Sequence, residues 1–203
     1  MGSVLKVTTD GFDTSPILRG AWISRNIVGI PLSPPPESVK AIEAEHGDAA
    51  TTLRKQIEQH KNHGACHACH RHIDPYGFGL ENFDATGQWR SKYRVEQPHD
   101  GTFQFRLEGY YREGVDVDAS GEIGLVEFED VFGLRRLLVS DHRRIAYNFA
   151  KKFFEYANGY KPSLSQRVVL LGMISDRPEQ CRIQDLAIEI LVYSVTGKSN
   201  ASE

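Results

Sequence analysis

The stretch HGACHACHRHIDP, residues 63–75, places two cysteines and four histidines among thirteen positions. The whole chain of 203 residues holds only three cysteines and eight histidines. Cys66, Cys69 and His70 form the pattern Cys-x-x-Cys-His, which is the spacing that attaches a c-type haem. In such a site the two thiols bond to the porphyrin and the adjacent histidine coordinates the iron. The stretch therefore predicts one covalently bound haem c, with His70 as its proximal iron ligand.

Three other sites could use the same side chains. A zinc knuckle could take Cys66 and Cys69 with His70 or His72, but a structural zinc site draws a second ligand pair from elsewhere, and the sequence offers no clear second pair. A thioredoxin-like dithiol would follow a strand, whereas this motif follows a helical pattern. An iron–sulfur cluster usually needs four cysteines. The motif favours haem, with zinc and the dithiol as alternatives.

Helical periodicity surrounds the cysteine cluster on both sides. It is present in five segments: 15–29, 49–62, 140–159, 163–175 and 182–194. Ser15 can cap the first of these helices, and Gly29 can end it. In the second, Leu53, Ile57 and His60 fall at i, i+4 and i+7, so we expect His60 on the inward-facing stripe.

The region between residues 92 and 126 has a different pattern. The run TFQFRLEGYY, residues 102–111, alternates apolar and polar side chains, which is typical of a half-buried strand. We therefore expect a mainly α fold: a cytochrome c-like haem module with a small β or irregular insert and a C-terminal helical subdomain. The expected parts are an N-terminal helix with a proline-rich linker (1–36), the haem-attachment module (37–95), the insert (96–126), the C-terminal helical subdomain (127–197) and a tail (198–203).

Composition narrows the classes of partner. The net charge is −3 and the isoelectric point is near 6.2, with no basic stripe, so we expect no nucleic-acid partner. No apolar run reaches the length of a membrane span, and the N-terminus lacks the apolar core of a signal peptide. Because haem is attached to Cys-x-x-Cys-His outside the cytoplasm, we expect a periplasmic or exported protein whose leader is not in this sequence.

Several motifs together resemble a domain family that is abundant in planctomycete bacteria. The central stretch, residues 53–90, is similar to that family's pattern L-x-x-H-R, C-x-x-C-H, D-P-x-G-F, E-N-F-D and G-x-W-R. Residues 15–36 resemble its upstream R-G-x-W and polyproline block. Three further segments resemble the family's companion C-terminal domain: 117–121, 142–159 and 182–195.

The resemblance covers about residues 3 to 195, and it implies a c-type cytochrome that transfers electrons. In that family the two modules usually form the C-terminal end of a larger exported protein, so the implied partners are a redox protein or neighbouring domains of the parent chain. Family members often end in an aromatic residue and a methionine, where this chain has TGKSNASE. No ligand role carries over to that end. The alternatives are a peroxidase-like haem enzyme with an open sixth iron position, and a zinc-stabilised interaction module.

The sixth iron ligand has two candidates in this sequence. Met173 could supply a thioether, although its apolar surroundings in VVLLGMIS equally suit a core-filling side chain. His60 faces inward and matches the histidine of L-x-x-H-R, but the short connection to Cys66 would have to carry it around the haem edge. A core histidine or a propionate contact is the competing interpretation of His60.

Residues downstream of the motif could support the haem. The carbonyl of Pro75 is placed to accept the second ring N–H of His70, as histidine ligands require. Trp89 could pack on the haem, and Arg90 could pair with a propionate, because a guanidinium suits carboxylates. The alternative is that residues 77–90 form a loop that packs on the protein core.

A calcium loop is a further possibility in the sequence DVDASGEIGLVE, residues 116–127. Oxygen-bearing side chains alternate along it, Gly121 allows a sharp turn and Ile123 occupies the apolar eighth position, as in an EF-hand loop. No helix is expected before Asp116, and a plain Asx turn is the alternative. The candidate calcium ligands are Asp116, Asp118, Ser120, Glu122 and Glu127.

Overall fold

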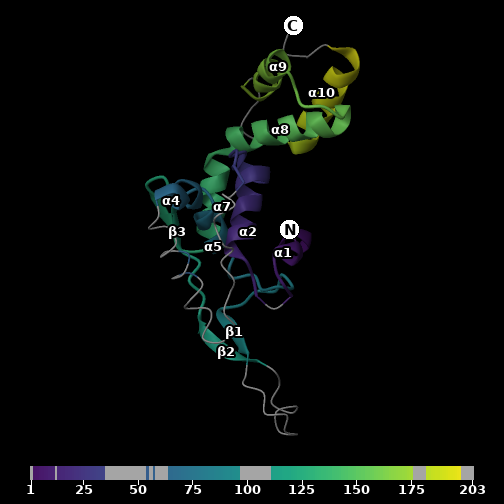
Figure 1. Ribbon diagram of the computed structural model, residues 1–203. Coiled ribbons are helices and arrows are strands. Elements are labelled where there is room, and N and C mark those ends of the chain that lie inside the picture. The colour runs from purple at the N-terminus through teal and green to yellow at the C-terminus, as the bar shows by residue number, and fades with distance from the viewer. Residues whose placement is uncertain are drawn as a thin grey trace. The chain divides into compact units, whose positions relative to one another are not determined.

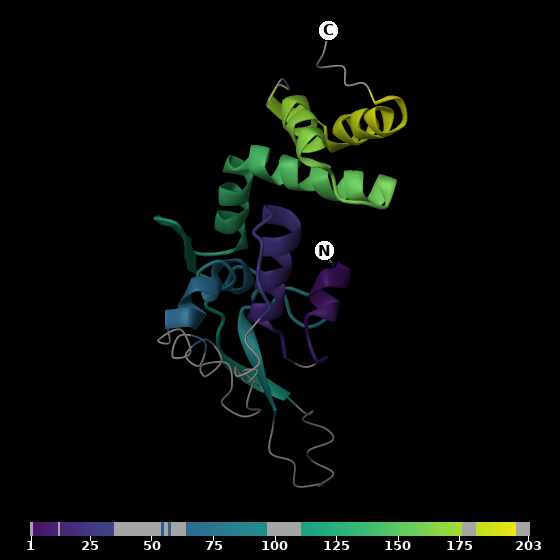
Figure 2. The same ribbon diagram turned by 45° about the horizontal axis from the view of Figure 1, so that its top comes forward.

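The computed structural model describes residues 2–11, 13–34, 54, 57, 64–96, 111–175 and 182–197. It is mainly helical with two small two-stranded sheets, which confirms the expected fold class (Figures 1 and 2). The chain forms two compact units. The first comprises residues 1–24 and 31–135, and the second comprises residues 25–30 and 136–203. Among the described residues, no helix has both the length and the apolar character needed to cross a membrane.

Helix α2 (Pro16–Ile23) begins where the sequence predicts. Its N-cap Ser15 accepts the backbone N–H of Leu18 at 3.2 Å, and proline occupies the first turn, where no N–H is needed. The helix continues into a π-helix, η1 (Ser24–Val28), and the chain leaves it at Gly29, whose φ of 80° suits glycine. The expected helix over residues 15–29 is therefore confirmed, with its second half wound as a π-helix.

The first unit contains α1 (Gly2–Val7), α4 (Gly64–His70) and α5 (Asp74–Phe78) besides α2. Helices α2 and α5 pack with almost no space between their backbones (Figure 1). A Cβ on Gly20 would lie 2.0 Å from the carbonyl oxygen of Ile73, and a Cβ on Gly77 would lie 1.9 Å from that of Pro16. These two glycines therefore set the position of α5, which directly follows the cysteine cluster.

Two antiparallel ribbons complete the first unit. Strand β1 (Lys92–Glu96) pairs with β2 (Tyr111–Asp116), and β3 (Gly121–Ile123) pairs with β4 (Val126–Phe128). The strand expected over residues 102–111 lies outside the described residues except for Tyr111, which opens β2. The first helix after this hairpin begins at Val131, because residues 126–128 pair with β3.

The second unit is built from helices that pack on one apolar core. Helix α7 (Val131–Ser140) leads into it, and α8 (His142–Asn158), α9 (Leu164–Ser175) and α10 (Ile183–Thr196) form it. Gly159, at φ 75°, ends α8 as the sequence predicts. The buried core side chains come from all three of these last helices: Ala150, Phe154, Leu170, Met173, Ile174, Leu186 and Ile190.

Candidate functional site

The Cys-x-x-Cys-His motif lies on helix α4. Positions 66, 69 and 70 are spaced i, i+3 and i+4 along this helix, so they share one of its faces. Cys69 is half-buried, and the side chain of His70 is only 11% exposed. The side chain of Cys66 lies outside the described part. The local helix thus groups the three positions as attachment of one ligand requires.

The imidazole of His70 is held by a buried carboxylate. Its Nδ1 lies 2.9 Å from Oδ1 of Asp74, and the side chain of Asp74 is 1% exposed. With Asp74 ionised, its oxygen can only accept, so Nδ1 of His70 is then the donor, and a neutral ring that donates from Nδ1 presents its lone pair at Nε2. That is the arrangement of a metal-binding histidine with an orienting partner.

This partner corrects the sequence-based expectation for Pro75. The carbonyl of Pro75 accepts the backbone N–H of Gly79 at 3.1 Å, as one turn of α5 requires. The acceptor at His70 is instead the side chain immediately before the proline. The signal for Asp74 was present in the sequence as the i, i+4 spacing from His70, which brings two side chains together on a continuous turn.

The backbone between His70 and Asp74 is tightly anchored. The N–H of Ile73 donates to the carbonyl of His70 at 3.0 Å. The carbonyl of His72 accepts a hydrogen bond from the hydroxyl of Ser24, which is fully buried. The His70–Asp74 pair is therefore built on a fixed turn rather than on a loose loop.

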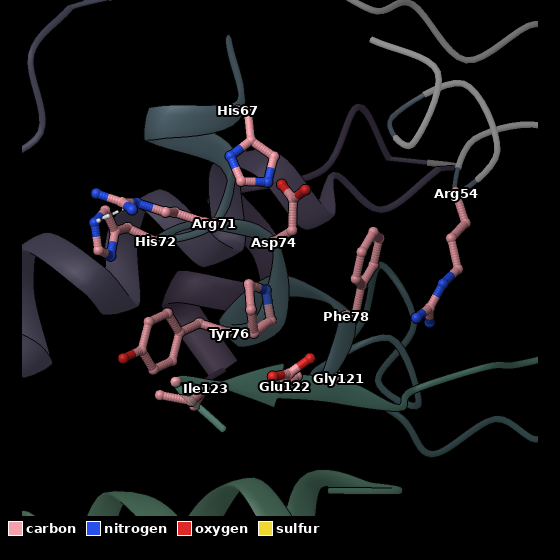
Figure 3. A pocket seen from close by; sticks show the side chains of 12 residues that line it. Arg54, His67, Arg71, His72, Asp74, Tyr76, Phe78, Gly121, Glu122 and Ile123 are labelled. Atoms are coloured by element: carbon pink, nitrogen blue, oxygen red, sulfur yellow. Dashed lines mark hydrogen bonds between the residues drawn. The ribbon is translucent and has the colours of Figure 1, made fainter. Parts of the chain in front are cut away.

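A cavity of about 520 Å³ lies beside α4, within the usual size range of cofactor pockets. Of the described residues of the motif, His67 lines it, whereas Cys69 and His70 do not. Figure 3 shows that Asp74, Tyr76 and Phe78 border it from α5, while Glu122 and Ile123 border it from β3. The remaining lining residues are Arg54, His67, Arg71, His72, Pro75, Gly121 and Gly124. The carboxylate that orients His70 thus also lines a pocket with aromatic walls and cationic side chains at its margin.

The residue types on α4 fit a c-type haem. A porphyrin supplies four of the iron ligands itself, so such a site needs two cysteines and one oriented histidine, and α4 carries these three positions. Within the part of the chain that the structure describes, no group of three or more His, Cys, Asp or Glu side chains could hold a metal ion without such help.

Arg54 contacts both Phe78, which lines the cavity, and the segment before β3. Its guanidinium carbon lies 4.3 Å from the centre of the Phe78 ring, and its Nη1 lies 3.0 Å from the carboxylate of Asp118. The same guanidinium donates to the carbonyl oxygens of Asp118 and Ser120 at 2.9 and 3.2 Å. A cationic side chain therefore already occupies the oxygen-rich face of this turn.

Residues 116–127, the possible calcium loop, do not have an EF-hand conformation in this structure, because residues 121–123 and 126–128 pair as the β3–β4 hairpin. Glu122 and Glu127 lie opposite each other in the β3–β4 hairpin. Asp118 makes an Asx turn, accepting the N–H of Ser120 at 3.0 Å and its hydroxyl at 2.6 Å. Burial raises the pKa of Asp118, but the bonds from Ser120 and the charge of Arg54 outweigh it and lower the pKa overall. Asp116, the remaining candidate ligand, ends β2 and is exposed.

Arg90 is part of a buried ion-pair network rather than a free propionate anchor. Its Nη2 lies 3.1 Å from Oε2 of Glu81 and 2.7 Å from the hydroxyl of Thr14. The other oxygen of Glu81 lies 3.3 Å from Nη1 of Arg19, a side chain with 0% exposure. Burial raises the pKa of Glu81, whereas the charges of Arg90 and Arg19 oppose that rise. This corrects the expectation that Arg90 pairs with a haem propionate, because its guanidinium pairs with Glu81 inside the protein.

Trp89 lies on the surface of the same loop. Its side chain is 53% exposed, and its ring meets Phe83 edge-on at 5.6 Å and Phe132 at 6.1 Å between centroids. The contacts of Trp89 and Arg90 match the alternative reading of residues 77–90 as a loop that packs on the core.

Of the two candidate distal ligands, the structure describes Met173 but not His60. Met173 is 2% exposed and belongs to the core of the second unit, which favours the packing role that the sequence left open. His60 lies outside the described residues. Its neighbour on the predicted stripe, Ile57, is fully buried.

We expect Met173→Ala to weaken the second unit. Removing a buried methionine side chain leaves a cavity and costs about 2–5 kcal/mol. Hydrogen exchange measured by mass spectrometry should show faster exchange across α8, α9 and α10. Val168→Ala on the same helix, at a site 63% exposed, is the control and should change little. Unchanged exchange across these three helices in Met173→Ala would contradict the packing role of Met173.

Comparison with known proteins gives one match. Residues 1–93 match the family model PSCyt3, described as a protein of unknown function (DUF1588). This match contains the Cys-x-x-Cys-His motif, α2 and α5, and the family's name points to a cytochrome-like domain. No curated protein and no solved structure matches the chain.

Proposed function

We propose that this chain is a c-type cytochrome module that carries one haem and transfers electrons. Cys66 and Cys69 form the covalent attachment, and His70 is the proximal ligand. The observation that carries the proposal is the Cys-x-x-Cys-His motif on α4 with His70 buried and oriented by Asp74 at 2.9 Å. The cytochrome-like name of the matching family supports it.

Asp74, Tyr76 and Phe78 have separate roles in this function. When bound, haem c supplies a one-electron iron couple. Asp74 fixes the ring orientation of His70, while Tyr76 and Phe78 line the adjoining cavity. Electron transfer needs no substrate contact, so a redox protein or a neighbouring domain of a parent protein is the expected partner. Covalent haem attachment places the protein in the periplasm or outside the cell.

A second candidate function is peroxidase-like chemistry at an open sixth iron position. The observation that favours it is again the Asp74 carboxylate on His70, because a more electron-rich axial ligand favours cleavage of an O–O bond. A high-spin spectrum with peroxide turnover would support this function, and a low-spin spectrum without turnover would support electron transfer.

The test of attachment uses cysteine variants made in a host with c-type haem maturation machinery. The chain should retain haem after denaturing electrophoresis, as detected by haem staining. Cys66→Ser combined with Cys69→Ser should abolish the stain, because no thioether bond can form. Cys181→Ser removes the third cysteine and should leave the stain unchanged. An unstained natural chain beside a stained control cytochrome from the same cells would refute the proposal.

A further inference from the structure

Asp74 offers His70 a negatively charged acceptor, which differs from a neutral one in its effect on the ring. A carboxylate draws the Nδ1 proton more strongly than an amide carbonyl does, and so raises the basicity of the ring as a metal ligand. A more basic axial ligand stabilises Fe(III) relative to Fe(II). The hydrogen-bond partner of His70 can therefore set the position of the one-electron couple.

We propose that Asp74 is a positioning residue that lowers the reduction potential of the haem through His70. The inference rests on the proposed function, and it concerns this chain's own pair: Nδ1 of His70 and Oδ1 of Asp74, 2.9 Å apart, with the Asp74 side chain 1% exposed. Burial keeps water from competing for this bond and strengthens its electrostatic effect.

The surrounding structure makes the interaction persistent. Gly20 lets α2 approach the Ile73 carbonyl, and Ser24 binds the next carbonyl upstream, that of His72. Asp74 directly follows these two anchored residues. These contacts hold the backbone of the turn in place, so the side chains of His70 and Asp74 stay within hydrogen-bond reach of each other.

Asp74→Asn tests the proposal because an amide oxygen can still accept the Nδ1–H but carries no charge. Spectroelectrochemical titration of the haem-loaded protein should show a higher midpoint potential. We expect about a tenfold change in the ratio of reduced to oxidised protein at a fixed potential, which is a rise of about 59 mV for one electron. Asp74→Glu keeps the carboxylate and should restore most of the natural potential.

The control is Glu113→Gln, which removes the same charge from a side chain that is 80% exposed on β2. It should leave the midpoint potential unchanged, since exposed charges are screened. Equal midpoint potentials for the natural protein and Asp74→Asn, with haem attached in both, would overturn the proposed role of Asp74 but not the proposed function. A natural chain without attached haem would instead overturn the proposed function.

A direct measurement on the natural protein covers the case in which Asp74→Asn does not fold. Resonance Raman spectroscopy of the photolysed carbon monoxide adduct of reduced protein reports the iron–histidine stretching frequency. A frequency shifted from neutral imidazole complexes toward imidazolate complexes supports the proposal. A frequency equal to that of neutral imidazole complexes overturns it.

Discussion

Replacing Glu81 by alanine is expected to destabilise the first unit by about 3–5 kcal/mol, because it leaves two buried cations without their counter-ion. Glu81 is 1% exposed and lies 3.3 Å from Arg19 and 3.1 Å from Arg90. Its Oε2 also accepts the hydroxyl of Thr14 at 2.7 Å. In the natural protein, attraction to the Glu81 carboxylate offsets the cost of burying the guanidinium groups of Arg19 and Arg90. The variant loses this attraction.

Urea unfolding followed by tryptophan fluorescence measures this loss. Both tryptophans, Trp22 and Trp89, belong to the first unit, so the signal reports that unit. Glu113→Ala is the matched control, since Glu113 pairs with Lys92 at 3.3 Å on the surface and such pairs contribute about 0–1 kcal/mol. If Glu81→Ala unfolds at the same urea concentration as Glu113→Ala, the network does not stabilise the unit.

Adding a single methyl group at Gly77 is expected to cost about 3 kcal/mol or more. A Cβ there would lie 1.9 Å from the carbonyl oxygen of Pro16 and 2.6 Å from its carbon. Both atoms are backbone, so α2 and α5 must separate for the side chain to fit. Because α5 begins at Asp74, the same separation should also disturb the hydrogen bond to His70.

Gly2→Ala is the control for Gly77→Ala. Gly2 also lies in a helix of the first unit, and a Cβ there meets nothing within 4 Å. Its substitution should change the free energy of unfolding by about 0.5 kcal/mol or less. A stable Gly77→Ala variant with a natural unfolding midpoint would show that the two helices are not held at this distance.

Helix boundaries could be predicted from the sequence because local chemistry determines them. Ser15 accepts the N–H of Leu18 within one turn, and Gly159 takes the left-handed conformation that ends α8. The Cys-x-x-Cys-His motif is local in the same way. These features need no information about residues far away in the chain.

Features that depend on distant partners could not be predicted in this way. Arg90 pairs with Glu81 and Thr14, and Thr14 lies 76 residues away in the sequence. The oxygen-rich turn at Asp118 is bound by Arg54, 64 residues upstream. In both cases the residue type indicates a charge that needs a partner, but only the fold selects which partner it finds.

The calcium pattern and the acceptor at His70 show a third limit. Residues 116–127 have the spacing of a calcium loop, yet the pairing of β3 with β4 uses the same backbone. At His70 the sequence offers a carbonyl and a carboxylate in adjacent residues. The turn between α4 and α5 places the carboxylate of Asp74 next to Nδ1 of His70, because side chains spaced i, i+4 lie close together. The Pro75 carbonyl instead accepts a backbone N–H of α5's last turn.

The measurement that tests the central proposal most directly is the pyridine haemochrome spectrum of the natural chain after acid–acetone extraction. The protein should come from a host that attaches haem to Cys-x-x-Cys-His. We expect pigment to remain with the protein and the reduced spectrum to show the α band of haem c, with one haem per chain. Pigment that leaves with the solvent, or a colourless protein from this host, would contradict covalent attachment through Cys66 and Cys69.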